Sequence, residues 1–319
     1  MEIRSLISNQ PISNQPISNL LSSNTMEFTI HADTPFSLPA VVNSHGWVQL
    51  PSFEPNGDGG FRYVARLDGG RVAPLQVTPV ENGVRVQAED GLGAEAQAEV
   101  ADQVAWMVGL EQDLSPFYEL VEGEPRLAHV VAHRHGRLLR SPTLFEDVVK
   151  TILTTNTTWA GTIRMTENVV AQFGDPLQAD GQETARAFPT PQRLAQSDEE
   201  TLRRETGLGY RAPYVLGLAR AVAHGELDLE ALKTADLPTE ALRRELLSIK
   251  GVGDYAAANL LLLLGRHDYI PIDSIALRAV SQEWHDGQSI GPAEVRAAFE
   301  AWGEWKGLAY WFWRWSDEA

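Results

Sequence analysis

The fold is decided by the stretch Leu246-Leu247-Ser248-Ile249-Lys250-Gly251-Val252-Gly253-Asp254-Tyr255-Ala256-Ala257, in which one helix ends at a Gly-x-Gly turn and a second helix begins at once. The two glycines allow backbone geometry that other residues avoid, and the first N–H groups of the second helix have no partner within that helix. Such a helix end binds an anion without a cationic side chain, and a phosphate of a nucleic-acid backbone fits it. Taken alone, Gly-x-Gly favours a plain corner between two helices.

The residues that follow this hairpin add a second feature. A predicted helix leads to Gly265 and then to an extended segment that ends in Pro271-Ile272-Asp273. Pro271 fixes an extended backbone, and Asp273 lies at the start of the next predicted helix. An Asp at this position is ordinarily a helix cap.

Hairpin, helix and Pro-x-Asp together resemble the helix-hairpin-helix (HhH-GPD) superfamily of DNA glycosylases, from about residue 113 onward. The resemblance implies that Asp273 is the catalytic aspartate. Cleavage of an N-glycosidic bond builds positive charge on the sugar, and a carboxylate beside C1′ stabilises that charge and orients or deprotonates a water molecule.

The resemblance also assigns roles to the hairpin. It implies that Gly251, Val252, Gly253 and Tyr255 lie against the DNA, with backbone amides directed at a phosphate. Members of the family often bind a monovalent cation, Na⁺ or K⁺, through hairpin carbonyls. The carbonyls at the matching positions are those of Leu247, Ile249 and Val252.

Two further stretches resemble the 8-oxoguanine branch of the superfamily. Asn156 stands where that branch places an asparagine in the gap left by the flipped base. The loop Gly207–Ala212 matches one in which a tyrosine wedges the duplex and an arginine hydrogen-bonds the orphaned base, here Tyr210 and Arg211. Flipping a base costs a few kcal/mol, so a group that fills the gap is expected. The alternative for Tyr210-Arg211 is a helix start with a partly exposed arginine.

The C-terminal residues are rich in aromatic side chains. We expect Trp305, Trp311 and Trp315 to form a base pocket together with Tyr255. Trp311 and Trp315 are four residues apart and would share a helix face. A flipped, electron-poor base would stack there, and a cationic alkylated purine would gain cation–π attraction. Packing inside a core is the alternative for each tryptophan.

The position two residues after the second glycine indicates the reaction. Lyase-active members read Gly-Val-Gly-x-Lys, whereas here Tyr255 stands at the lysine position, as in the alkyl-purine branch. We therefore expect a monofunctional DNA glycosylase of base excision repair that removes an alkylated purine, such as 3-methyladenine, with water and without AP-lyase activity. The alternatives are an oxidised-purine glycosylase and a non-catalytic protein that binds DNA lesions.

Residues 26–112 are predicted to form a small antiparallel β domain, similar in placement to the N-terminal domain of the alkyl-purine and 8-oxoguanine branches. Strand-like alternation marks Glu27–His31, Phe61–Leu67 and Gly83–Gln87, with turn residues between them and a helix expected over Glu95–Leu110. Before them, residues 1–25 repeat Ile-Ser-Asn-Gln-Pro and are interpreted as a disordered low-complexity leader. The fold class is therefore α+β.

Residues 113–319 are predicted to be helical throughout and to form the HhH-GPD domain. Thr143 begins one helix, with Glu146 three residues later as in a capping box, and Gly174-Asp175-Pro176 ends the helix that begins at Thr158. Further helices are expected over 211–224, 239–248, 255–264, 275–283, 291–302 and 308–315.

No cofactor is predicted to be required, and a monovalent cation at the hairpin would have a structural role. The chain has no cysteine, which excludes disulfides, zinc-thiolate sites and cysteine-ligated iron–sulfur clusters. His129, His133 and His135 have no acidic or thiol partner at ligand spacing, and we interpret them as a solvated helix face.

The charge distribution and the hydropathy of the chain limit the kinds of partner that it is expected to bind. The net charge is −17, but residues 126–280 hold 18 basic and 19 acidic groups, so the acidity lies in the two ends. Binding of damaged double-stranded DNA by the middle segment would therefore depend on local groups rather than on a strong overall field. No apolar run is long enough to span a membrane and the start lacks the pattern of a signal peptide, so we expect a cytoplasmic monomer.

Overall fold

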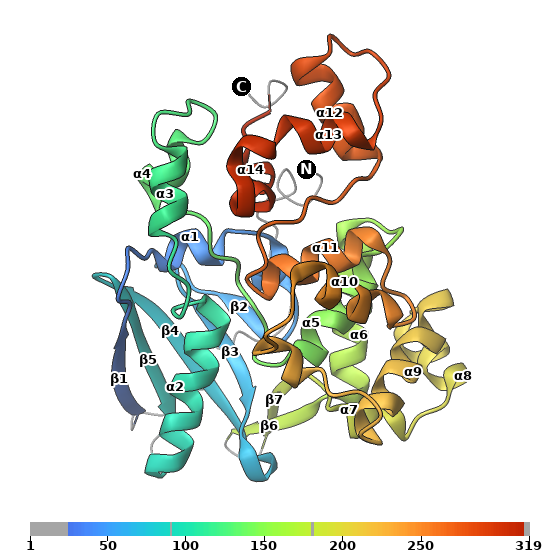
Figure 1. The fold of residues 1–319 in the computed structure, drawn as a ribbon. Helices are drawn as coiled ribbons and strands as arrows, with labels where there is room; N and C mark the ends of the chain where they lie inside the picture. The colour runs from blue at the N-terminus through green and yellow to red at the C-terminus, as the bar shows by residue number, and fades with distance from the viewer. Residues whose placement is uncertain (1–24, 90, 180–181, 316–319) are drawn as a thin grey trace.

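The computed structural model describes residues 25–89, 91–179 and 182–315. Except for Thr25, which belongs to the first strand, the predicted leader lies outside these residues. The chain forms an antiparallel sheet followed by a mainly helical part, and Figure 1 shows the sheet beside the central helices with α12–α14 above them. This confirms the predicted α+β class.

The N-terminal sheet has the strand order β1-β5-β4-β3-β2, and its neighbouring strands are antiparallel. Three of these strands correspond to the predicted segments, although β3 ends at Arg66, one residue before the predicted end. β4 was not predicted, because Pro74 and Pro79 interrupt its alternating pattern. It nevertheless lies at the centre of the sheet, between β3 and β5. The strands are β1 (Thr25–His31), β2 (Phe53–Pro55), β3 (Phe61–Arg66), β4 (Val72–Val80) and β5 (Gly83–Glu89).

Helices and short 3₁₀ turns make up most of the remaining structure. The predicted helices are confirmed, although several differ by a few residues at their ends. The elements are α1 (Leu38–Val42), η2 (Gly46–Gln49), η3 (Asp68–Gly70), α2 (Ala94–Val108), α3 (Ser115–Val121), α4 (Ala128–His133), α5 (Leu144–Thr154), α6 (Trp159–Phe173), α7 (Pro191–Ala195), α8 (Glu199–Thr206), η4 (Gly209–Arg211), α9 (Ala212–Ala223), η5 (Glu230–Lys233), α10 (Thr239–Ser248), α11 (Asp254–Leu263), α12 (Ser274–Trp284), α13 (Pro292–Ala298), η6 (Glu300–Trp305) and α14 (Lys306–Phe312).

One prediction for the second half of the chain is wrong. A two-stranded antiparallel sheet, β6 (Asp175–Ala179) and β7 (Gln182–Ala187), interrupts the helices. Pro176 ends the preceding helix as expected, but the chain then pairs with itself. Leu177 and Ala187 bury their side chains against Val64 of β3, and Arg66 pairs with Asp175. A contact with a strand more than 100 residues away has no counterpart in the local pattern.

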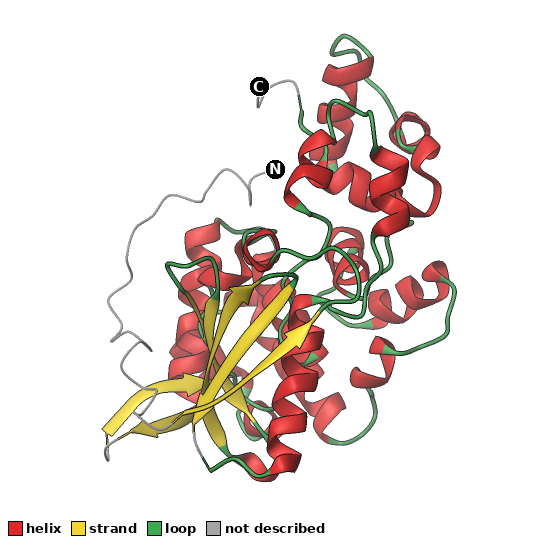
Figure 2. Ribbon diagram, turned by 90° about the vertical axis from the view of Figure 1, so that its left-hand side faces the viewer, coloured by secondary structure: helices red, strands yellow, loops and turns green. Residues whose placement is uncertain are grey.

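The two parts of the chain share one hydrophobic core, and ten of the eleven residues of α5 are buried. Figure 2 shows helices packed beside the sheet. Thr143 caps α5 by accepting the N–H of Glu146 (3.2 Å). The carboxylate of Glu146 does not complete the expected capping box, because it is buried between the hydroxyl of Tyr63 (2.8 Å) and the ammonium of Lys150 (2.6 Å). Because the core is continuous, the boundary between residues 112 and 113 stays a prediction.

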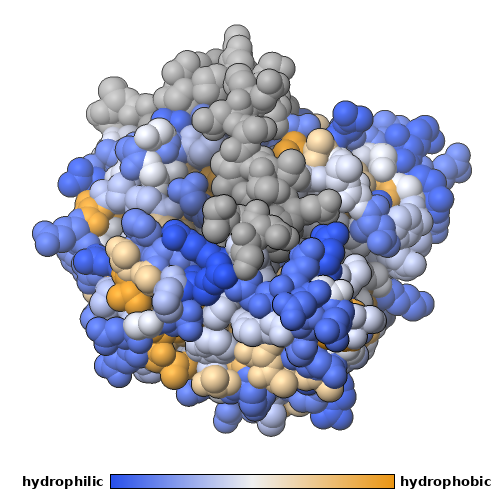
Figure 3. Space-filling model, turned by 90° about the horizontal axis from the view of Figure 1, so that it is seen from above, coloured by the Kyte–Doolittle hydropathy of each residue, from blue (hydrophilic) through white to orange (hydrophobic). Residues whose placement is uncertain are grey.

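The surface seen in Figure 3 is mainly hydrophilic, with apolar side chains in small, scattered patches. Only a few large hydrophobic side chains are exposed over the described ranges, namely those of Leu120, Val131, Tyr210, Leu237 and Trp284. Within the same ranges, no helix is both long and apolar enough to cross a bilayer.

Candidate functional site

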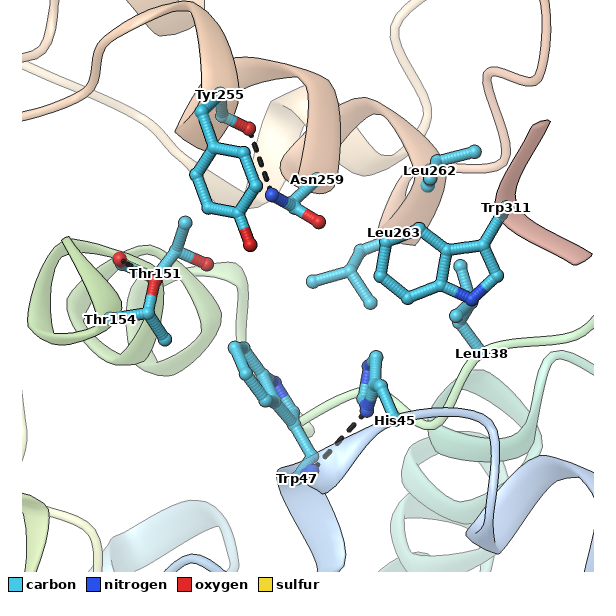
Figure 4. A pocket seen from close by; sticks show the side chains of 10 residues that line it. All are labelled: His45, Trp47, Leu138, Thr151, Thr154, Tyr255, Asn259, Leu262, Leu263 and Trp311. Carbon is cyan, nitrogen blue, oxygen red and sulfur yellow. Dashed lines mark hydrogen bonds between the residues drawn. The ribbon is translucent and has the colours of Figure 1, made fainter. Parts of the chain in front are cut away.

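A cavity lies where five segments of the chain meet. These are the turn around His45, the loop that contains Leu138, helix α5, helix α11 and helix α14, and Figure 4 shows their side chains converging on one space. The lining is mostly apolar and aromatic with a few polar groups, which is the usual character of a small-molecule or base pocket. The lining residues are His45, Trp47, Leu138, Thr151, Thr154, Tyr255, Asn259, Leu262, Leu263 and Trp311.

Helix α11 joins this pocket to the hairpin. Its first turn contains Tyr255, and Asn259 lies one turn further along the same face. The side-chain amide of Asn259 donates to the carbonyl oxygen of Tyr255 (2.9 Å). The helix therefore presents its free N-terminal amides at one end and lines the pocket with its first two turns.

The backbone of the hairpin turns tightly and passes close to neighbouring side chains, as its glycines predict. Gly251 has φ +95°, and a Cβ atom there would approach Tyr214 to 2.9 Å, so only glycine fits without rearrangement. Gly253 is the N-cap of α11, and the first helical carboxylate, Asp254, pairs with Arg243. This pairing offsets the negative charge beside the helix N-terminus, where an anion would bind.

The carbonyls assigned to a monovalent cation belong to the same turn. The carbonyl of Ile249 accepts the N–H of Val252 (3.0 Å). A carbonyl oxygen has two lone pairs, so this bond is compatible with one further ligand contact. Cation binding by Leu247, Ile249 and Val252 stays a prediction.

Asp273 is the N-cap of α12 and is half-buried. Its Oδ1 accepts the N–H groups of Ile275 (2.9 Å) and Ala276 (2.8 Å). Over the described residues no donor contacts Oδ2, so one carboxylate oxygen is available for a reactant. Burial raises the pKa of Tyr310, and the charges of Asp273 and Tyr255 raise it further, so the three groups share one electrostatic environment. Asp273 itself does not line the cavity.

The three residues expected at a DNA gap are brought together. Asn156, just after α5, has φ +47° and donates through its amide to the hydroxyl of Tyr210 (3.4 Å). The Tyr210 ring is 45% exposed, whereas Arg211 is only 6% exposed. The Arg211 guanidinium donates to the backbone carbonyls of Thr155 and Asn156. In this conformation it supports the Asn156 turn and is not directed at solvent, where an orphaned base would lie.

Two of the tryptophans predicted for the base pocket lie elsewhere. Trp305 stacks between Phe117 (5.6 Å between ring centroids) and His267 (5.2 Å). α14 ends at Phe312, so Trp315 does not share a helix face with Trp311. Instead, Trp315 packs in an aromatic core against the rings of Trp284, Phe299 and Tyr310. Trp311 lines the pocket, and so does Tyr255.

Much of the pocket lining was not predicted from the sequence. His45 and Trp47 come from the N-terminal part of the chain, and Thr151 comes from α5. Asn259 was recognisable in principle, because it is the lone polar residue in the run 256–264 and lies four residues after Tyr255. No local signal marks His45 or Thr151.

A buried charged cluster supports the wall formed by Trp47. Asp147 Oδ1 accepts from Nε1 of Trp47 (2.8 Å) and from the backbone N–H of Ser141 (2.9 Å). Burial raises the pKa of Asp147 to about 6, although these hydrogen bonds and Lys150 oppose the shift. The hydrogen bond from Nε1 to Asp147 therefore fixes the indole of Trp47 against α5.

The rings of His129, His133 and His135 lie close together in the structure. The rings of His129 and His133 lie 5.6 Å and 5.8 Å from that of His135, which stacks on Phe312. Across residues 25–89, 91–179 and 182–315, no group of three or more His, Cys, Asp or Glu side chains is arranged to hold a metal ion. His129 is buried, so the predicted solvated face is wrong for this residue.

Comparison with known proteins finds relatives of this chain. The model of the HhH-GPD superfamily of base excision DNA repair proteins matches residues 149–304. A Bacillus subtilis protein named DNA-3-methyladenine glycosylase is 26% identical over 209 residues, which cover 64% of this chain and 68% of that protein. A probable N-glycosylase/DNA lyase of Methanothermobacter thermautotrophicus is 25% identical over 253 residues, covering 73% and 78%.

Solved structures share the fold. A 3-methyladenine DNA-glycosylase from Archaeoglobus fulgidus superposes with a TM-score of 0.71 at 23% identity, over 89% of this chain and 97% of that one. The apo form of an 8-oxoguanine glycosylase/lyase from Clostridium acetobutylicum has a TM-score of 0.69 at 20% identity, over 90% and 94%. At these identities the likeness concerns the fold, which includes the N-terminal sheet.

Proposed function

We propose that this chain is a DNA glycosylase of the HhH-GPD superfamily of base excision repair, whose model matches residues 149–304, and that it is a monofunctional one that removes an alkylated purine. It would act as a monomer on damaged double-stranded DNA, without AP-lyase activity.

The observation that carries this proposal is the absence of an amine from the described pocket lining. β-Elimination requires an amine that attacks C1′ and forms a Schiff base. Tyr255 stands at the position of the lysine in lyase-active members, and a phenol forms no imine. Lys150, close to the pocket, is fully buried and paired with Glu146 (2.6 Å). Lys250 precedes the hairpin glycines and is exposed, beside the expected phosphate site.

Water is then the nucleophile, and the chain's own groups set its chemistry. Two backbone N–H groups fix Oδ1 of Asp273. The open Oδ2 would face the sugar, stabilise the positive charge that develops at C1′, and orient the attacking water. Amides at the start of α11 would bind a phosphate of the same strand. A Na⁺ or K⁺ ion at the hairpin carbonyls would add to the positive potential there.

The aromatic lining favours an alkylated purine. Trp47, Tyr255 and Trp311 present ring surfaces to the cavity, and alkylation leaves many purines electron-poor or cationic. Stacking and cation–π attraction to such rings are stronger for these bases than for the unmodified ones. The name of the Bacillus subtilis relative supports the same substrate class.

An oxidised purine is the second candidate, and one observation favours it. Asn156, Tyr210 and Arg211 are brought together as the resemblance to the 8-oxoguanine branch implies. These three residues would contact the gap in the DNA and the opposite base, whereas the pocket would bind the lesion base itself. A wedge of this kind is therefore compatible with either substrate.

A panel of lesion duplexes tests the proposal. Methylated DNA and an 8-oxoguanine duplex are incubated with excess protein, and the released bases are separated by chromatography. We expect release of methylated purines and an intact abasic strand. Release of 8-oxoguanine alone would favour the second candidate, and binding of lesion DNA without any release would indicate a non-catalytic lesion binder.

A further inference from the structure

Three polar atoms at the pocket have no hydrogen-bond partner within the described residues. They are Nε2 of His45, Oγ1 of Thr151 and Nε1 of Trp311. His45 is 8% exposed and Thr151 1% exposed, so bulk water does not solvate these atoms. A buried donor or acceptor without a partner is costly, and a group of them around one cavity indicates a ligand that supplies the partners.

His45 has a defined protonation state. Its Nδ1 accepts the backbone N–H of Trp47 (3.3 Å) and is therefore unprotonated. Burial, aided by the nearby charge of Lys150, lowers the pKa of His45 to about 3, so the ring is neutral at physiological pH. The single ring proton then lies on Nε2. Figure 4 shows the ring rising from its bond to Trp47 toward the space between Trp47 and Trp311.

Asn259 faces His45 from the opposite wall. Its side-chain nitrogen donates to the carbonyl of Tyr255 (2.9 Å), which fixes the orientation of the amide. The Oδ1 atom is turned toward the cavity (Figure 4). The pocket therefore offers a donor from the N-terminal part of the chain and an acceptor from α11.

We propose that His45 is a specificity-determining residue, which donates from Nε2–H to a ring nitrogen or carbonyl oxygen of the flipped purine while Asn259 accepts from an N–H of the same base. This inference rests on the proposed function, because it names how that pocket reads its base. The lesion is then selected by two neutral hydrogen bonds in addition to aromatic stacking, and the N-terminal part takes part in base recognition.

The test uses three variants of the full chain. His45→Phe keeps an aromatic ring but removes the hydrogen-bond donor. His45→Gln restores an N–H donor on a side chain without a ring. His267→Phe is the matched control, because His267 is also buried and neutral, with a pKa lowered to about 3, but stacks on Trp305 away from the pocket. Single-turnover release of 3-methyladenine and 7-methylguanine from dimethyl sulfate-treated duplex is measured, with thermal unfolding of each protein.

We expect His45→Phe to slow release by roughly 10- to 100-fold, the effect of losing one hydrogen bond to a buried group. The two bases present different acceptors, so the ratio of their release should change by about fivefold or more. His45→Gln should recover most of the rate, and His267→Phe should release both bases like the wild type. If His45→Phe does not fold, Asn259→Leu tests the opposite hydrogen bond, with a loss of roughly 10-fold expected.

The outcomes separate this inference from the function on which it rests. If the folded wild type releases no methylated base, the proposed activity itself is refuted, and the role of His45 with it. Release by His45→Phe at the wild-type rate and ratio would overturn the role of His45 alone. An equal loss in His45→Phe, His45→Gln and His267→Phe would show a structural effect and would also overturn it.

Discussion

Replacing Asp273 by Asn should separate catalysis from folding in this protein. The two oxygens of the carboxylate differ in the structure, since Oδ1 caps α12 and Oδ2 is open. An asparagine offers the same cap, because its amide oxygen can accept both backbone N–H groups. Only the negative charge is removed, and its attraction to the helix N-terminus contributes about 0.3–1 kcal/mol.

The expected catalytic effect is much larger than this change in stability. Loss of a group that stabilises transition-state charge costs about 10²-fold or more in rate, or about 2.7 kcal/mol. Asp273→Asn should therefore keep its melting temperature within a few degrees and keep its affinity for lesion DNA. Its rate of base release should fall by at least about 10²-fold.

Asp198→Asn is the matched control. Asp198 is also an aspartate N-cap, because its Oδ1 accepts the N–H of Thr201 (2.8 Å), but it begins α8, on the surface and outside the pocket lining. Base release under single-turnover conditions, DNA binding by fluorescence anisotropy and thermal unfolding are measured for both variants. Turnover of Asp273→Asn close to that of the wild type, or an equal loss in Asp198→Asn, would refute the assignment of Asp273 to the reaction.

Four further outcomes follow from the site. Borohydride should trap no protein–DNA adduct during turnover, because none of the described residues that line the pocket has an amine; an adduct that disappears in Lys250→Ala would contradict this. The dependence of DNA affinity on salt should be modest, since residues 126–280 are nearly neutral, and a log–log slope that implies about eight or more phosphate contacts would be incompatible with it. Arg211→Ala should lower the free energy of unfolding by about 1–3 kcal/mol, because the carbonyl of Thr155 loses a buried donor, and unchanged stability would argue against this structural role. The pKa of Asp147 is about 6 in the folded chain and 3.8 in the unfolded chain, so the unfolded chain loses this proton at a lower pH. The free energy of unfolding of the wild type should therefore fall by up to about 3 kcal/mol as the pH rises from 4 to 7. Asp147→Asn should lack this decline in denaturant unfolding at pH 4.5 and 7.5, and an identical pH dependence in both proteins would show that Asp147 is not the titrating group.

Several features could be predicted from the sequence because they depend on neighbours along the chain. The helix ends at Thr143, Thr158 and Asp273 follow from side chains that accept N–H groups two or three residues later. The Gly-x-Gly turn follows from the backbone freedom of glycine, and Gly251 indeed has a positive φ. Of the pocket lining, Tyr255 was predicted because it lies two residues after this turn.

The rest depends on packing between distant segments. Of the three tryptophans predicted for the base pocket, only Trp311 lines it, because α14 ends before Trp315 and Trp305 stacks elsewhere. The strands β6 and β7 are stabilised through contacts with β3. His45 and Asn259 are more than 200 residues apart in sequence and face one cavity only because α5 and α11 pack beside the N-terminal sheet. The chain's local patterns determined that a hairpin, an aspartate cap and a β domain exist. Which side chains meet at the pocket was decided by the tertiary structure, because burial and hydrogen-bond pairing over long distances leave no periodic mark on the sequence.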